Sequence, residues 1–230
     1  MAKLNIVDVH GKCLNFLLEY QRGNEGFYFV PRQRNNDRRL EQGMWFIGSM
    51  RYMQISFWIG QDHREKIHNI AFVIHQDNEC FLEISSCDDD SKAHFLMGLI
   101  KILGERAGLE FKKFNGNKWT HCFNDEVYDE IYLDELLYFI ENVKPIIDKY
   151  LSETESGIKF PDKKFDDKYV KSLRPYIDFV KLEKENKNKK TGTIAVKPTE
   201  HTRTLKHNEL SNKLTEYLKN NSYTSCYNRQ

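Results

Sequence analysis

The segment YMQISFWIGQDHREKIHNIAFVIHQDNECFLEIS, residues 52–85, decides the fold class. Its first part alternates: Met53, Ile55 and Phe57 fall on one side and more polar residues on the other, the period of a strand with one buried face. Two further apolar runs follow, separated from each other by a polar four-residue turn. The predicted strands are 52–59, 67–75 and 80–85. Short strands joined in sequence by polar turns predict an antiparallel meander.

The flanking sequence adds helices and more strands. Apolar residues at helical spacing predict helices, and Asn115-Gly116 between two short apolar runs predicts a hairpin. Pro145 suits the first turn of a helix. The further predicted elements are helices over 9–20, 95–103, 133–140 and 144–151, and strands over 27–31, 44–48, 109–114 and 118–123. We therefore expect an α+β fold, a mostly antiparallel sheet with two to three packed helices, over residues 1–151.

Composition changes after residue 151. Residues 152–203 predict a short helical extension followed by a lysine-rich linker, because so many charges with so few apolar residues cannot build a core. Leucines return at helical spacing in residues 204–220, which predicts an amphipathic helix within a final segment, 204–230. The apolar stripe of that helix needs a cover, which could be the main domain or a partner protein.

Composition also excludes several classes. The 230 residues hold 35 Lys and Arg against 34 Asp and Glu, a net charge of +1, so the chain is not a uniformly basic nucleic-acid coat. No apolar run approaches the ~20 residues of a membrane span, and no signal peptide is visible. Five scattered cysteines without a CxxC pair indicate reduced thiols. We expect a cytoplasmic protein with no cofactor and no metal site, since phosphate-cradling glycine motifs and paired Cys/His ligands are missing from the sequence.

The candidate binding residues are arginines with nearby aromatics. Guanidinium groups match phosphate oxygens, and indole rings stack on bases. The lysine-rich segment could add non-specific attraction to DNA or RNA through counterion release. The predicted nucleic-acid-binding residues are Arg32, Arg34, Arg38, Arg39, Trp45, Trp58, Lys187, Lys189 and Lys190. The plainer interpretation is a solvated loop with core aromatics and a solubilising tether.

Nuclease chemistry is a further hypothesis. Metal-dependent cleavage of phosphodiesters needs clustered carboxylates and a lysine near the attacking water. Acid-x-Lys triplets occur at Glu110-Lys112, Asp90-Lys92 and Asp166-Lys168, a frequency that a highly charged chain produces by chance. We expect no catalytic residue in this chain. The alternative is a small nuclease in which Glu110 and Lys112 are catalytic.

The string RTLKHNELSNKLTEYL, residues 203–218, resembles the opening helix of restriction-endonuclease-like (PD-(D/E)xK) nuclease domains in prokaryotic restriction and phage-defence proteins. The strings YFVPR (28–32) and ISFW (55–58) are similar to regions that precede such domains. The resemblance implies an N-terminal DNA-recognition module followed by the first piece of a nuclease domain, whose catalytic positions would lie beyond Gln230. A protein-interaction or sensor domain without catalytic activity, and a small metal-dependent nuclease, remain the alternatives.

Overall fold

The structure is a computed structural model of the whole chain. It describes residues 3–59, 68–86, 90–115, 118–123, 130–154 and 157–190. The predicted helix over 204–220 lies outside these residues.

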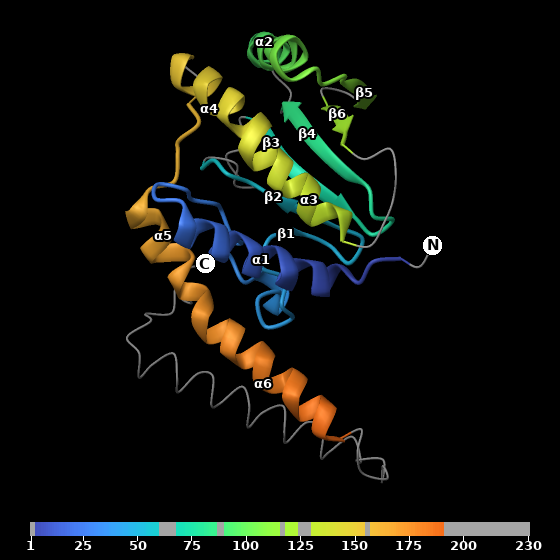
Figure 1. The fold of residues 1–230 in the computed structure, drawn as a ribbon, viewed down its shortest axis with the longest axis vertical. Helices are drawn as coiled ribbons and strands as arrows, with labels where there is room; N and C mark the ends of the chain where they lie inside the picture. Colours follow the sequence, from blue (N-terminus) through green and yellow to red (C-terminus); the bar gives the residue numbers. More distant parts are fainter. Residues whose placement is uncertain are drawn as a thin grey trace.

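One antiparallel sheet organises the fold (Figure 1). Its six strands run in the order β1-β2-β3-β4-β6-β5, and every neighbouring pair is antiparallel. The strands are β1 (Ile47–Gly48), β2 (Tyr52–Ile55), β3 (His68–His75), β4 (Cys80–Ser86), β5 (Lys112–Asn115) and β6 (Lys118–Cys122). The α+β class with an antiparallel sheet is confirmed, and the 68–86 hairpin forms where the polar turn predicted it.

The register of the sheet explains its two faces. Ile55 pairs with Phe72, and Phe72 pairs with Leu82, so apolar side chains from β2, β3 and β4 stand side by side in the core. Because side chains alternate along a strand, the opposite face carries Gln54, Asn69 and other more polar residues. The helix-packed face and this open face therefore have different chemistry.

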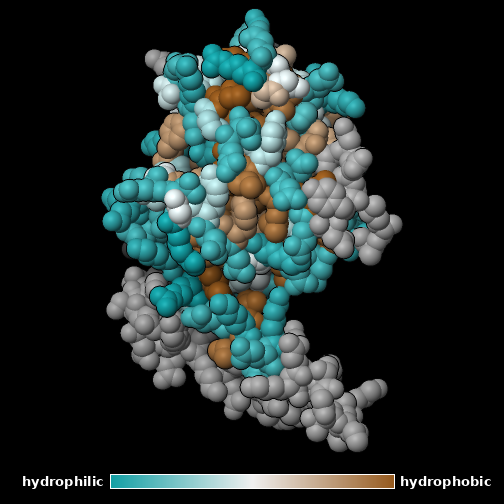
Figure 2. All heavy atoms as spheres, viewed as in Figure 1, coloured by the Kyte–Doolittle hydropathy of each residue, from teal (hydrophilic) through white to brown (hydrophobic). Residues whose placement is uncertain are grey.

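Some helices pack against the sheet and others lie beyond them, and the last described helix extends away from the strands (Figure 1). The helices are α1 (Ile6–Gly23), α2 (Asp90–Ala107), α3 (Ile131–Tyr138), α4 (Lys144–Glu153), α5 (Lys163–Tyr169) and α6 (Arg174–Lys190), with short turns η1 (Asn36–Arg38), η2 (Phe139–Val143) and η3 (Lys171–Leu173). Figure 2 shows this helical side of the molecule, where hydrophilic side chains predominate and hydrophobic ones surface mainly along the seams between elements.

Phenylalanine rings form the centre of the core. The ring centroid of Phe139 lies 5.5 Å from those of Phe57 and Phe72, and 6.1 Å from that of Phe123. Aromatic pairs at these separations add attraction beyond the area that they bury. Phe139 joins the helical layer to the strands at this point.

The helices predicted over 133–140 and 144–151 form one continuous run with a π-helical segment, η2, between α3 and α4. Pro145 follows that segment directly. Proline offers no N–H, and its ring crowds the carbonyl four residues earlier, which here belongs to Glu141. The wider π turn keeps the helix continuous past this proline.

Several predicted strands are shorter in the structure: β2 ends at Ile55 instead of residue 59, and β5 begins at Lys112 instead of residue 109. Residues 27–31 form no regular strand, and only Val30 makes an isolated bridge, to Ser56. The strand predicted over 44–48 is reduced to Ile47–Gly48. The apolar residues of these last two segments are buried by side-chain packing, without pairing in a regular strand. Apolar character alone therefore predicted more strand than forms.

The lysine-rich segment begins as helix, because α6 continues to Lys190 instead of ending where the apolar residues end. The sequence places Glu183 and Glu185 four residues before Lys187 and Lys189, a spacing that supports a helix. Near its middle, α6 is tied to the start of α1 by an ion pair between Lys184 Nζ and Asp8 Oδ1 (3.0 Å). The expectation of an unfolded linker is therefore wrong for residues 181–190.

Residues 157–190 also contact the main unit. The backbone N–H of Ile59 donates to the Lys159 carbonyl (2.7 Å), and Gln21 Nε2 on α1 donates to Asp166 Oδ1 on α5 (2.9 Å). Phe165 and Phe179 are buried. None of the helices described is long and apolar enough to cross a membrane.

Candidate nucleic-acid interface

Arg32 connects the arginine segment, residues 32–39, by hydrogen bonds to the residues that precede β1. Its backbone N–H donates to the Trp45 carbonyl (2.7 Å). Its guanidinium donates from Nε to the Met44 carbonyl (3.0 Å) and from Nη2 to the Phe46 carbonyl (2.7 Å). Arg32 is half-buried and has a structural role that the sequence did not indicate.

His10 holds the same peptide from the other side. The N–H of Phe46 donates to His10 Nδ1 (3.2 Å), and the two rings stack with centroids 5.9 Å apart. Burial, and then the positive charge of Arg32, lower the pKa of His10 from 6.5 to about 3. The ring is therefore neutral and carries its proton on Nε2. No sequence signal marks His10, because a single histidine on a helix has no motif.

A tight turn then redirects the arginines. Asp37 and Arg38 both have a left-handed backbone, with φ of +53° and +55°. The Asn35 side chain stabilises this turn by accepting from the backbone N–H of Leu40 (2.8 Å). Side chains at consecutive positions of the turn consequently face different surroundings, which separates the arginines.

Three of the four arginines line one pocket of about 430 Å³, which we call the arginine pocket. Arg32, Arg34 and Arg39 form its wall together with Asp37. Its floor is the open face of β2 and β3, with Gln54, Asn69 and Ala71, together with Ser56 directly after β2. The sequence predicted the proximity of the arginines, but it did not predict the strand residues beneath them.

Arg38 is the exception. It pairs with Glu41 in the same turn, and it borders a separate depression next to α6. The structure therefore places Arg38 outside the arginine pocket. This separation makes it a useful control residue, since it shares a segment and a charge with the other three.

The charges in the pocket favour an anion. Burial and the nearby guanidinium of Arg39 lower the pKa of Arg32, and Asp37 opposes the effect only in part. Arg39 lies 3.9 Å from the Asp37 carboxylate and donates to Met44 Sδ. Arg32 and Arg39 therefore repel each other, and a bound anion would relieve this repulsion.

A buried polar network supports the floor of the pocket. Asn69 Nδ2 donates to Glu83 Oε1 (3.1 Å), and the other oxygen of Glu83 pairs with Lys118. Glu83 is only 8% exposed, although it stands in the middle of β4. Because a buried carboxylate is costly unless it is paired, this network holds each member in one orientation.

Neither predicted tryptophan can stack on a base in this structure. Trp45 is 4% exposed and Trp58 is 0% exposed. Trp58 borders the arginine pocket but has no accessible ring surface, and its Nε1 donates to Asp148 Oδ1 on α4 (2.8 Å). The aromatic part of the prediction is therefore wrong, since β2 ends at Ile55 and the chain beyond it turns the indole into the core.

The predicted lysines do not join the pocket. Lys187, Lys189 and Lys190 lie at the end of α6, and no described residue of α6 lines the arginine pocket. Their side chains lie outside the described part of the structure. Their part in nucleic-acid binding stays a prediction.

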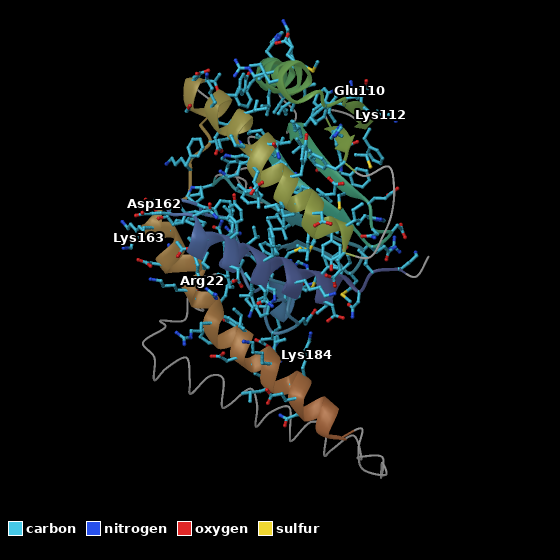
Figure 3. The ribbon with its side chains drawn as sticks, in the orientation of Figure 1. Arg22, Glu110, Lys112, Asp162, Lys163 and Lys184 are labelled. Atoms are coloured by element: carbon cyan, nitrogen blue, oxygen red, sulfur yellow. The ribbon has the colours of Figure 1, made fainter. Side chains whose placement is uncertain are left out.

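The acid-x-Lys triplets are scattered. Figure 3 shows Glu110 and Lys112 at the β5 edge, far from Asp162 and Lys163 at the start of α5, the helix that carries Asp166 and Lys168. Among the described residues, no group of three His, Cys, Asp or Glu side chains is placed to hold a metal ion. Asp166 accepts a hydrogen bond from Gln21, so this carboxylate has a structural role in joining α5 to α1. The side chains of the Asp90-Lys92 triplet lie outside the described residues.

No family model, no curated protein and no solved structure matches the chain. The interpretation of the arginine pocket therefore rests on its own geometry and charge.

Proposed function

We propose that the chain is a nucleic-acid-binding recognition module that holds a phosphate of DNA or RNA in the arginine pocket. The observation that carries this proposal is the convergence of Arg32, Arg34 and Arg39 on one cavity above a polar strand surface. The resemblance of residues 203–218 to restriction-endonuclease-like domains supports a restriction or phage-defence setting.

The donors of the pocket suit a phosphate. A guanidinium has five N–H groups, and Arg32 uses two of them on the backbone carbonyls of Met44 and Phe46. The charge of Arg39 lowers the pKa of Arg32, and both residues line the same pocket. Charge-assisted hydrogen bonds of this kind contribute roughly 1.5–3 kcal/mol each.

A double substitution tests the proposal. Arg34→Ala with Arg39→Ala should weaken binding of a short single-stranded oligonucleotide by roughly 10- to 100-fold at low salt. Arg32 is kept because it is part of the fold. The slope of log affinity against log salt should also become shallower by about 1.4, since each phosphate contact on a single strand contributes about 0.7. Fluorescence anisotropy across a salt series measures both quantities, on DNA and RNA of one sequence.

The matched control is Arg22→Ala with Arg38→Ala. It removes the same charge from two exposed arginines, at the end of α1 and in the arginine segment, neither of which lines the pocket (Arg22 is labelled in Figure 3). We expect less than about a threefold loss of affinity from this variant. Equal losses from the two double variants, or no binding by the unchanged chain at low salt, would contradict the proposal.

A further inference from the structure

We infer that the arginine pocket accepts one nucleoside phosphate unit, either a strand end or a free nucleotide, with the phosphate on the arginine wall and the base on the strand floor. The inference rests on the proposed function and adds the part of the nucleic acid that is recognised. It also assigns a role to Asn69, which the sequence did not single out.

The size of the site is the first argument. A volume of about 430 Å³ lies within the ~300–1,000 Å³ range of pockets that enclose small ligands. A duplex presents a continuous backbone on its outside and would contact a surface rather than fill such a cavity. A single nucleotide unit matches both the volume and the concave shape.

The division of chemistry within the pocket is the second argument. Among the described residues that line the pocket, the cationic groups come from the arginine segment, whereas β2, β3 and Ser56, just after β2, supply amides, a methyl group and a hydroxyl. Ala71 lies in the floor between longer residues and contributes a methyl group there. A nucleoside phosphate carries the same division, with an anion at one end and a flat, hydrogen-bonding ring at the other.

The orientation of Asn69 is the third argument. Its Nδ2 donates one hydrogen to Glu83, which Lys118 holds in turn, so Oδ1 and the second Nδ2 hydrogen are the groups left to meet a ligand. An amide oxygen accepts from an N–H on the edge of a base. An apolar residue in place of Glu83 would avoid the cost of burying a carboxylate, so the presence of Glu83 indicates a role other than packing. We assign Glu83 and Lys118 as positioning residues for Asn69.

Calorimetric titration of the full chain with a nucleoside 5′-monophosphate, ribose 5-phosphate and inorganic phosphate tests the inference. We expect the nucleotide to bind at least about tenfold more tightly than ribose 5-phosphate, since a base contact of one hydrogen bond plus ring burial is worth about 1.4 kcal/mol or more. Asn69→Ala and Gln54→Ala should each reduce that preference and leave the affinity for ribose 5-phosphate unchanged. Arg34→Ala with Arg39→Ala should weaken all three ligands.

Thr120→Ala is the control, because Thr120 lines a neighbouring depression on the same sheet face but not the arginine pocket. Its nucleotide preference should equal that of the unchanged chain, and thermal melting of every variant separates a lost contact from a lost fold. Equal binding of the three ligands, or a preference that survives both Asn69→Ala and Gln54→Ala, would overturn the inference.

Competition separates the two sources of the ligand. Displacement of the nucleotide by a 5′-phosphorylated oligonucleotide, but not by a circular single strand, supports a strand end. No displacement by either strand supports a free nucleotide, and in that case the inference holds while the proposed function fails. If oligonucleotide binding depends on Arg34 and Arg39, but a nucleotide binds no more tightly than ribose 5-phosphate, the proposed function holds and the inference fails.

Discussion

Replacing Trp58 with alanine should lower the free energy of unfolding by about 3–5 kcal/mol. The indole is fully buried, lies edge-on to Phe57 with ring centroids 6.1 Å apart, and donates to Asp148 on α4. Its removal leaves a cavity between the end of β2 and the helical layer and deprives Asp148 of one partner. Urea denaturation followed by circular dichroism measures the change.

Trp58→Phe is the matched variant. It keeps an aromatic ring at this position with a smaller loss of packing and removes the hydrogen bond, and Asp148 retains Lys144 as a partner (2.6 Å). We expect a loss of about 1 kcal/mol, with oligonucleotide affinity unchanged. If Trp58→Ala instead kept full stability and lost binding, Trp58 would contact the ligand, as the sequence alone had suggested.

Acid should destabilise the protein through His10. The pKa of His10 is about 3 in the folded protein, against 6.5 in the unfolded chain, so only the unfolded chain takes up this proton as the pH falls below about 6.5. This contribution is absent at neutral pH and grows until the pH reaches about 3. Between about pH 7.5 and pH 5 it should lower the free energy of unfolding by about 2 kcal/mol.

His10→Asn isolates this effect. The Asn side chain can place Oδ1 where Nδ1 accepts from the Phe46 N–H, and it does not titrate in this range. The variant should therefore lose about 2 kcal/mol less than the unchanged chain over the same pH interval in urea denaturation. Identical pH dependence of the two proteins would show that His10 takes up its proton in the folded state.

Local patterns in the sequence predicted the elements whose stability is mainly local. The α1 helix shows its apolar stripe directly, and a polar turn between two apolar runs identifies the 68–86 hairpin. Prediction of the elements failed where burial or helix length depends on contacts with distant segments of the chain. Residues 27–31 are apolar because they pack against the core, and α6 extends through lysines because charge spacing and its contact with α1 support it.

The amino-acid sequence by itself determined that four arginines lie within one short segment and that the sheet has one apolar face. The tertiary structure alone decided that Arg38 leaves the group, that Trp45 and Trp58 are buried, and that Asn69 and Glu83 lie beneath the remaining arginines. The physical reason is that strand alternation says which residues share a face. What covers that face depends on segments distant in the chain, whose positions follow from packing of the whole core.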